Sequence, residues 1–396
     1  MDYRFSDRIS PLKASAIREI LKFTADPSVI SFAAGNPAPE AFPVETIREI
    51  SAKLLEQNPI LALQYSISEG YPALRDLLKD RLKKQGIFNP DRDELMIVSG
   101  AQQGVELSCK VLCNEGDVVI SEAPSFIGSL NAFRSLATRL VGVPLEEDGV
   151  SLTALEAAMQ ANPDARLFYI IPNFQNPSGI TTSEAKRHAV YALAKRYGVL
   201  LLEDNPYGDL RFSGEDIPAI KTLDEDGIVL YCGSFSKVLA PGLRVGYLVA
   251  PKEIISKVVV AKQVSDVHTN IWAQALCERF LATQDMDAHL AHLREIYRHK
   301  CALMQEGLRH RMHPAISFTK PEGGLFLWGT LPNGVDMMDF CRQAVARKVA
   351  IVPGSAFMMQ EEDATQSFRL NFSTPTDEQI ERGTEILGEL SHEILK

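Results

Sequence analysis

The amino-acid sequence predicts an α/β fold, in which a mostly parallel sheet lies between helices and a smaller α+β domain is attached. Helical patterns alternate with short β-branched and apolar runs from Val44 to Pro251, and this alternation is typical of a parallel sheet. Because the apolar runs are nearly continuous, the strands are expected to be buried on both faces. After residue 252 the pattern changes to long helical stretches and then to strands between helices, which indicates a second unit.

The expected elements follow in chain order. A short amphipathic segment, Ser15 to Phe23, precedes a Gly- and Pro-rich loop at 32–43 that predicts a boundary. Six apolar runs predict strands at 96–100, 117–122, 166–172, 199–204, 227–234 and 244–251. Residues 252–313 predict helices with few interruptions. In the tail, strand patterns at 323–331, 349–357 and 367–373 are interspersed with helical patterns at 335–348 and 377–390, so the small domain is placed there, joined by the N-terminal arm.

Composition and charge exclude several functional classes. The 396 residues include 51 acidic and 41 basic side chains, a formal charge of −10, so no general positive field attracts nucleic acid or an anionic membrane. Six cysteines are too few for a disulfide scaffold and predict reduced core thiols. His289, His292 and His299 share a helical stretch, but no acidic ligand completes a metal site. Neither a signal-peptide core nor a membrane-spanning apolar run is found, so a cytoplasmic protein is expected.

Polar side chains follow the predicted strands, at the edge where an open parallel sheet binds its ligands. Ser99 to Gly104 open a helix whose free backbone N–H groups suit a phosphate, although a plain strand-to-helix turn gives the same pattern. Asn173 to Gly179 follow a later strand and are also typical of a turn. Asp204 ends an apolar strand, where a carboxylate is costly to bury without a cationic or protonated partner; the alternative is a simple cap.

The segment from Gly233 to Gly246 carries the most specific pattern. Ser234 and Ser236 share one side of an extended backbone, Lys237 points to the other side, and Arg244 returns at the start of the next strand. Two serines and an arginine suit a phosphate monoester, whereas a lysine taken alone is most often a solvated surface residue. The glycine-rich fingerprints of dinucleotide-binding and P-loop proteins do not occur in the sequence.

Ten blocks of the sequence occur in a characteristic order. They are SFAAGNPAPEAFP, QYSISEGYPALR, VSGAQQGVELS, EAPSF, IPNFQNPSG, EDNPYGDLRF, GSFSKVLAPGLRVGY, KPEGGLFLW, VPGSAF and FRLNFS. Together they resemble the fold-type I enzymes that use pyridoxal 5′-phosphate (PLP), specifically the class I/II aminotransferases, and their wording is similar to the 2-aminoadipate/kynurenine/aromatic branch. The resemblance covers nearly the whole chain. It implies a large PLP-binding domain at 43–285 and a small domain formed by 1–42 and 286–396.

The resemblance assigns Lys237 to the Schiff base with PLP. A lysine serves as nucleophile and then as base only if its pKa is lowered and it lies close to the substrate Cα. Asp204 matches the carboxylate that pairs with the pyridine nitrogen and keeps it protonated, which makes the ring an electron sink. Asn176 and Tyr207 match the pair that hydrogen-bonds the cofactor's O3′, and Asn176 is also expected beside the substrate.

The same resemblance implies a phosphate cradle and a stacking ring. The residues that match the cradle are Gly100, Ala101, Gln102, Ser234, Ser236 and Arg244. Phe126 matches the aromatic residue that stacks on the cofactor ring. Many relatives have Tyr at this position, so the stacking face is kept while a hydroxyl is lost.

Four further residues are implied to act on the substrate. Arg369, in FRLNFS, matches the arginine whose planar fork binds the α-carboxylate. Tyr65 matches a residue that reaches the cofactor and substrate of the neighbouring subunit, which implies a homodimer. Gly35 lies in the N-terminal loop that approaches the substrate, and Ala34 stands where the aminoadipate branch usually has a second glycine. Arg18 matches a position that contacts an acidic substrate side chain; a solvated arginine on a short amphipathic helix is the alternative.

The implied activity is transamination between an α-amino acid and a 2-oxo acid, with 2-oxoglutarate as the expected acceptor and pyridoxamine phosphate as intermediate. Two alternatives keep the cofactor: a lyase or β-eliminating enzyme that uses Lys237, Asp204 and Arg369, and a PLP-binding regulatory domain. The regulator is less expected, because only about forty residues precede the large domain and none forms a basic helix-turn-helix pattern. The donor stays open among acidic, aromatic, kynurenine-like and branched amino acids.

Overall fold

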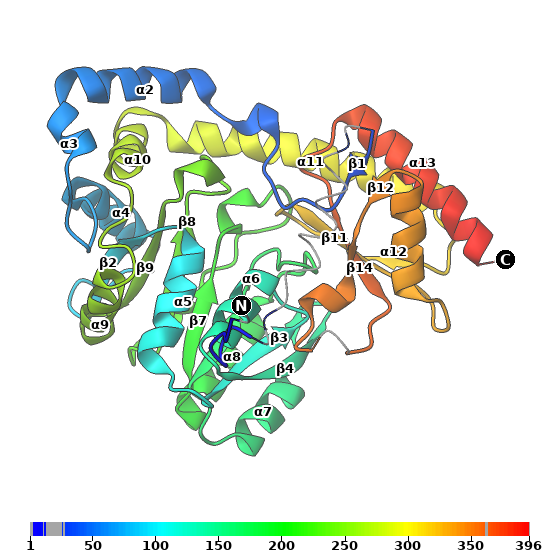
Figure 1. Cartoon of the computed structure of the whole chain (residues 1–396), viewed down its shortest axis with the longest axis horizontal. Coiled ribbons are helices and arrows are strands. Elements are labelled where there is room, and N and C mark those ends of the chain that lie inside the picture. Colours follow the sequence, from blue (N-terminus) through cyan, green and yellow to red (C-terminus); the bar gives the residue numbers. More distant parts are fainter. Residues whose placement is uncertain (1–2, 11, 13–25, 27, 361–362, 396) are drawn as a thin grey trace.

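The computed structural model describes residues 3–10, 12, 26, 28–360 and 363–395. These residues form a large unit around an eight-stranded sheet and a smaller unit around a four-stranded sheet (Figure 1). Arg18 and the helix predicted from Ser15 to Phe23 lie outside the described residues.

The eight-stranded sheet confirms the predicted, mostly parallel architecture. In spatial order its strands are β2 (Asp93–Val98), β9 (Gly246–Pro251), β8 (Val229–Ser234), β7 (Leu200–Asp204), β6 (Leu167–Ile170), β3 (Val118–Ala123), β4 (Arg139–Glu146) and β5 (Gly149–Val150). Strands β8, β7, β6, β3 and β4 run parallel, whereas β9 is antiparallel to both of its neighbours and β5 is antiparallel to β4. Strand β6 is buried along its whole length and β7 and β8 nearly so, as expected for strands covered on both faces.

Alternating side chains of the sheet separate two hydrophobic cores. Phe168 and Leu201 pack on one face with α7 (Leu152–Ala161) and α8 (Glu184–Tyr197). Their neighbours Tyr169 and Leu202 point to the other face, into the core that includes α5 (Ala101–Leu112). The remaining helices of this unit are α2 (Val44–Gln57), α3 (Pro59–Leu63), α4 (Pro72–Lys84), α6 (Ile127–Ser135), α9 (Lys252–Gln263) and α10 (Ile271–Thr283).

Strands β4 and β5 were not predicted from the sequence. Strand β4 lies near one end of the sheet, and most of its residues are exposed or half-buried, so it lacks the continuous apolar run that marks the central strands. Its place is fixed by pairing with β3 instead. The strand predicted at 244–251 begins only at Gly246, because Arg244 adopts a left-handed backbone conformation with φ of 52° and ψ of 46°.

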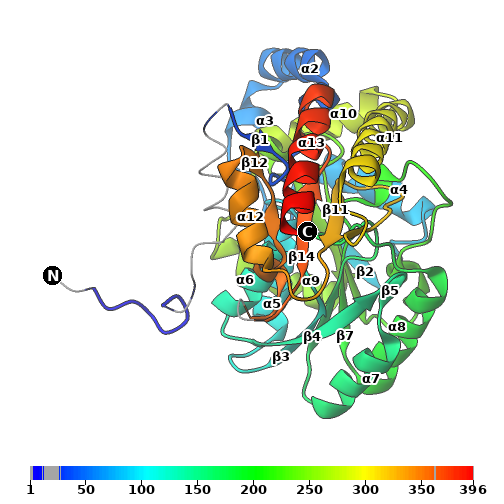
Figure 2. The same cartoon turned by 90° about the vertical axis from the view of Figure 1, so that its right-hand side faces the viewer.

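The smaller unit contains an antiparallel sheet in the order β10 (Ser317–Phe318), β11 (Phe326–Thr330), β14 (Ser367–Asn371) and β13 (Val352–Pro353). Helices α12 (Met337–Ala346) and α13 (Asp377–Ile394) lie in front of this sheet in Figure 2. The long helix α11 (Met286–Arg311) runs from the α10 side of the large unit to α13 (Figure 1). Strand β1 (Ile30–Ser31) pairs with β12 (Val349–Ala350), so the N-terminal arm joins the small unit.

Short 3-10 helices complete the description: η1 (Pro39–Ala41), η2 (Gly208–Leu210), η3 (Ile220–Leu223), η4 (Pro241–Leu243) and η5 (Gly354–Phe357). Within the described part of the chain, no helix combines the length and apolar character needed to cross a bilayer, and no cluster of His, Cys, Asp and Glu could hold a metal ion. The cysteines are free thiols, and all except the half-buried Cys113 are buried.

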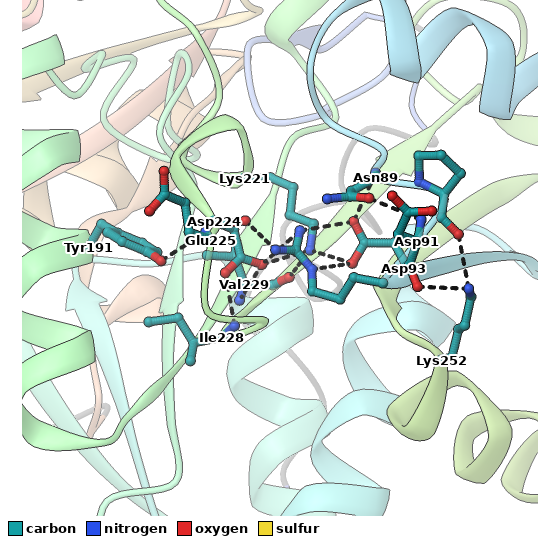
Figure 3. A network of polar contacts seen from close by, with 12 residues as sticks. Asn89, Asp91, Asp93, Tyr191, Lys221, Asp224, Glu225, Ile228, Val229 and Lys252 are labelled. Carbon is teal, nitrogen blue, oxygen red and sulfur yellow. Dashed lines mark hydrogen bonds and ion pairs between the residues drawn. The ribbon is translucent and has the colours of Figure 1, made fainter.

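A buried ionic network joins η3 to the starts of β2 and β8 (Figure 3). The ammonium group of Lys221 is fully buried and donates to Asp93 at 3.1 Å, to Asp224 at 2.8 Å and to the Val229 carbonyl at 2.8 Å. Burial opposes ionisation of Asp93, but hydrogen bonding from Arg92 and the charge of Lys221 hold the pKa of that carboxyl below its ordinary value. The network fastens the ends of the strands opposite to those where Asp204 and Ser234 lie.

Replacing Lys221 by methionine is expected to destabilise the fold by about 3–5 kcal/mol, because two buried carboxylates lose a cationic partner. Lys195→Met is the matched control, since the Lys195–Asp226 ion pair is 2.9 Å long but the lysine side chain is 57% exposed. The control is expected to cost only about 0–1 kcal/mol. Urea unfolding followed by circular dichroism measures both, and equal losses would contradict a structural role for the network.

Candidate active site

The predicted site residues gather at the carboxyl ends of the parallel strands. Strand β7 ends at Asp204 and β8 at Ser234, and the two strands are paired with Asp204 beside Cys232. The loops that follow them, together with the loop after β6, therefore leave the sheet at one edge, where open α/β sheets bind ligands. Hydrogen bonds join residues of these loops to the N-terminal arm and to the small unit.

Asp204 is a buried carboxylate with one satisfied oxygen. Its Oδ2 accepts a hydrogen bond of 2.7 Å from the Tyr169 hydroxyl, whereas its Oδ1 is buried and has no hydrogen-bond partner among the described residues. Burial raises the pKa of Asp204 to about 6, and the hydrogen bond from Tyr169 opposes this rise. A buried acceptor without a hydrogen-bond partner destabilises the fold, so a bound group that donates to Oδ1 would be stabilised there.

Lys237 lies in the turn that follows β8, and the pKa of its ammonium group is lowered. Burial, and then the positive charges of Arg369 and Arg244, lower the pKa of the Lys237 ammonium to about 8. Its Nζ donates to the carbonyl oxygen of Gly35 at 2.6 Å, so the N-terminal arm lies against the amine. A lysine with a pKa near neutrality can act both as a nucleophile and as a base.

Arg369 reaches the site from β14 of the small unit. It donates to Asn176 Oδ1 at 2.8 Å and to the Ala33 carbonyl at 2.7 Å, while its Nε is buried without a partner among the described residues. The guanidinium lies between the rings of Phe326 and Phe357, at 4.4 and 4.8 Å from their centroids. Burial lowers the pKa of Arg369 to about 10, so it remains a cation at neutral pH.

Asn176 and Tyr207, which were predicted to act together, are in contact. The Asn176 side-chain amide donates to the Tyr207 hydroxyl over 3.5 Å and, on its other side, accepts from Arg369. Asn176 therefore links the large unit to the small one. Burial raises the pKa of Tyr207 far above its ordinary value, so its hydroxyl keeps its proton.

The predicted phosphate cradle is assembled around Arg244. Its guanidinium donates to Ser236 Oγ at 3.4 Å and to the Ser99 carbonyl at 3.3 Å. Gly100 has a φ of +79°, and a Cβ at this residue would lie 2.2 Å from Arg244 Nη2. Helix α5 begins directly after Gly100, so the backbone N–H groups of its first turn, including those of Ala101 and Gln102, point out of the helix end.

The remaining predicted cofactor residues border this cradle. Ser234 Oγ accepts from the Ser236 backbone at 3.1 Å, and the Gln102 side chain donates to the Gly128 carbonyl at 2.9 Å. Phe126 is half-buried and immediately precedes α6, with its ring close to the α-carbon of Gly128.

One predicted residue within the described part of the chain is not brought into this cluster. Tyr65 is 82% exposed and makes an edge contact with the His268 ring, at 5.8 Å between centroids. Arg18 lies outside the described residues.

Four residues that shape the site were not predicted from the sequence. Tyr169 donates a hydrogen bond to Asp204, Ser129 donates one to Tyr169, and Phe326 and Phe357 flank Arg369. In the sequence, Tyr169 is one more member of an apolar strand, and Ser129 lies in a helix without any motif. The two phenylalanines lie in quoted blocks but have the pattern of ordinary core residues, so no local signal singled them out.

Comparison with known proteins identifies the family. The model of the family described as aminotransferase class I and II matches residues 27–387. The chain belongs to the class I and II aminotransferases. It is 39% identical over 402 residues to aromatic-amino-acid aminotransferase 1 from Thermococcus litoralis, and the match covers 100% of this chain and 96% of that protein.

Solved structures of other aminotransferases have the same fold. A kynurenine aminotransferase from Pyrococcus horikoshii, in complex with PMP, superposes with a TM-score of 0.95 at 37% identity, covering 99% of this chain and 98% of that one. An alpha-aminoadipate aminotransferase from Thermus thermophilus, complexed with N-(5′-phosphopyridoxyl)-L-leucine, gives a TM-score of 0.91 at 36% identity with the same coverage. These relatives support transamination with PLP as the cofactor, and they do not favour the lyase or the regulator.

The geometry of this aminotransferase fits PLP. Asp204 Oδ1 accepts no hydrogen bond from the described residues. It is therefore free to accept one from a protonated ring nitrogen. Because Gly100 has no Cβ, its backbone can lie close to Arg244. A turn that binds phosphate through its backbone requires such a close approach. Lys237 provides an amine of lowered pKa for the aldehyde.

Gly100→Ala is expected to weaken PLP retention about tenfold or more, because the added methyl displaces the Arg244 guanidinium. Gly116→Ala is the matched control: Gly116 has a φ of +85°, but its added Cβ meets no atom within 4 Å. Both glycines have a positive φ, so both variants carry a backbone cost of about 1–3 kcal/mol for a non-glycine residue in a sparsely populated conformation. Equilibrium dialysis of the cofactor separates the two effects, and equal retention by the two variants would refute the cradle.

Proposed function

We propose that this aminotransferase transfers the α-amino group of an amino acid to a 2-oxo acid, with 2-oxoglutarate as the acceptor. The observation that carries the proposal is that an acidic and a basic side chain lie at the same edge of the sheet. Asp204 is a buried carboxylate with a free oxygen, and Lys237 is an amine whose pKa is lowered to about 8. A cationic ring that carries an aldehyde offers a group to each: a hydrogen-bond donor for the free oxygen and an electrophilic carbon for the amine.

Lys237 and Asp204 divide the chemistry between them. When bound, PLP supplies an electrophilic carbon for amino groups and a ring that withdraws electrons from the substrate Cα. Asp204 holds a proton on the ring nitrogen through Oδ1. Lys237 Nζ, as a free amine, would remove the proton from the substrate Cα, and its lowered pKa suits this exchange near neutral pH.

The other residues bind and orient. Asn176 and Tyr207 hold the ring oxygen, and their mutual hydrogen bond keeps both side chains in place. Gly100, Ala101 and Gln102 offer backbone groups to the phosphate. Ser234, Ser236 and Arg244 complete the cradle from the other side, and Phe126 stacks on the ring. These contacts lie away from the reacting bonds, and their role is to fix the orientation of the cofactor.

Arg369 is proposed to bind the α-carboxylate of the substrate. Its fork is held by the two flanking phenyl rings, which limit rotation. Arg369 also donates to the Ala33 carbonyl, and Lys237 donates to the Gly35 carbonyl, so the arm at 33–35 is tied to both substrate-facing groups. We propose that this arm, which includes Gly35, covers the bound substrate and excludes water.

A visible absorbance titration tests the function. Adding a mixture of amino acids that includes aromatic amino acids, kynurenine and 2-aminoadipate, without an oxo acid, is expected to convert the cofactor spectrum, and 2-oxoglutarate is expected to restore it. The Lys237→Ala variant is expected to bind cofactor and show no turnover, because the base at the substrate Cα is lost. Lys195→Ala, a surface lysine, is the control.

Two results would contradict the proposal. Full transamination by Lys237→Ala would exclude the lysine as the base. Release of pyruvate and ammonia without any oxo acid acceptor would instead identify a lyase that uses the same cofactor.

The exposed apolar residues support a homodimer. Two segments of the described chain, 60–67 and 264–267, expose Ile60, Leu63, Tyr65, Ile67, Val264 and Val267. We call these six residues the apolar patch. The ring of Tyr65 contacts that of His268, which directly follows the second segment, so the two segments lie side by side. An exposed cluster of large apolar side chains is typical of a protein interface, and a two-fold dimer places the same patch of both copies in contact.

The apolar patch adjoins the phosphate cradle. Asp266, within the second segment, accepts from Ser99 at 2.7 Å and from Gln103 at 2.8 Å, and the carbonyl of Ser99 binds Arg244. In a two-fold dimer built on the patch, Tyr65 of the second copy therefore faces this cradle. We propose that Tyr65 completes the site of the opposite copy.

Val264→Asp is expected to convert the dimer to monomers and to lower activity strongly, because a charge is buried within an apolar interface. Val264 is 76% exposed in the isolated chain. Met338→Asp, on α12 of the small unit and 41% exposed, is the control and should stay dimeric. Analytical ultracentrifugation measures the state; a fully active monomer would contradict the shared site.

We also propose that the two units divide as the resemblance implies, with 43–285 as the large domain and 1–42 with 286–396 as the small one. Helix α11 begins at Met286, and β1 pairs with β12 of the small unit. The Asn176–Arg369 hydrogen bond then crosses between the domains at the site itself.

A further inference from the structure

Tyr169 occupies a buried position between Ser129 and Asp204. The residue is 0% exposed and lies on β6. The Ser129 hydroxyl donates to the Tyr169 oxygen at 2.8 Å, and the Tyr169 hydroxyl donates to Asp204 Oδ2 at 2.7 Å. A buried tyrosine hydroxyl needs hydrogen-bond partners. Here an ionised carboxylate can only accept and the serine donates, so the direction of both hydrogen bonds is defined.

The sheet register brings Tyr169 to Asp204. Tyr169 pairs with Leu202 of the parallel strand β7, and side chains two residues apart share a face, so Tyr169 and Asp204 point to the same side. The length of the tyrosine side chain spans the offset of two residues. An edge contact with Phe133, at 5.4 Å between ring centroids, holds the ring in this direction.

The direction of the hydrogen bonds fixes where the protons are. Because Ser129 donates to the tyrosine oxygen, the tyrosine proton is left for Asp204. Burial and the charge of Asp204 raise the pKa of Tyr169 well above its ordinary value, so Tyr169 remains a donor. The charge of Asp204 also acts on Tyr207 and Cys232, and burial raises both of their pKa values, so they too are neutral.

Among the described residues, the Tyr169 hydroxyl is thus the hydrogen-bond donor that opposes the desolvation of Asp204. It engages Oδ2 and leaves Oδ1 for a ligand. A carboxylate without this donor would lose ionisation and orientation together, because both of its oxygens would then be buried without a partner.

We propose that Tyr169 and Ser129 are positioning residues of this aminotransferase: as a directed pair of hydrogen bonds they keep Asp204 ionised and turn its free oxygen toward the ring nitrogen of the cofactor. The inference rests on the proposed function, since it assigns Asp204 to that nitrogen. Neither residue touches the substrate or the reacting atoms in this arrangement, and both act through Asp204.

The test uses the holoenzyme loaded with PLP that carries an isotopic label at the ring nitrogen. Tyr169→Phe removes one hydroxyl and keeps the ring. Its nitrogen NMR shift is expected to move toward the value of the unprotonated ring, and the PLP dissociation constant is expected to rise about tenfold to a hundredfold. Ser129→Ala, which leaves the Tyr169–Asp204 bond in place, is expected to change both quantities in the same direction by less.

Tyr231→Phe is the matched control. Tyr231 is also buried on the sheet, but its hydroxyl accepts from Asn205 at 2.9 Å on the face opposite to Asp204. This variant shares the loss of a buried hydroxyl, so it corrects for any general loosening, and its nitrogen shift should match that of the wild type.

The Asp204→Asn variant distinguishes the positioning role of Tyr169 and Ser129 from the assignment of Asp204 to the ring nitrogen. If Asp204→Asn changes the nitrogen shift while Tyr169→Phe and Ser129→Ala do not, the positioning role is overturned and the proposed function stands. If Asp204→Asn itself leaves the shift and the affinity unchanged, the assignment of Asp204 fails, and the inference fails with it.

Discussion

Asp204 carries a negative charge in the interior of the protein, at the end of β7, where an ion loses the hydration that water would give it. The rest of the site compensates for this loss. Tyr169 supplies one hydrogen bond, and the free oxygen requires a second donor that the described chain does not contain. In the proposed function a cofactor with a protonated nitrogen would meet this requirement, so binding the cofactor would also complete the hydrogen bonding of the core.

The same interior controls the cations. Lys237 lies near the positive charges of Arg369 and Arg244, so burial and repulsion together lower its pKa and leave the amine available for chemistry. Arg369 stays charged because two aromatic faces and two hydrogen bonds replace its water. Residues from both units contribute to this balance, which explains why the site lies where the small unit meets the large sheet.

Much of this organisation could be predicted from the sequence. The central strands appear as continuous apolar runs because both faces are buried, and Asp204 and Lys237 stand out because they follow such runs. Strand β4 escaped notice because its exposed residues carry no such run. Tyr169 and Ser129 escaped notice for a different reason: they are separated by 40 residues, and a buried tyrosine in an apolar strand has the pattern of an ordinary core residue.

The sequence alone determined the fold class, the family and the residue types available at the strand ends, since these depend on local periodicity and on ordered motifs. Only the tertiary structure decided which of those residues meet. The register of β6 on β7 aims Tyr169 at Asp204, and β14 brings Arg369 to Asn176 across 193 residues of chain. Such contacts depend on side-chain direction and on long-range packing, and local patterns carry neither.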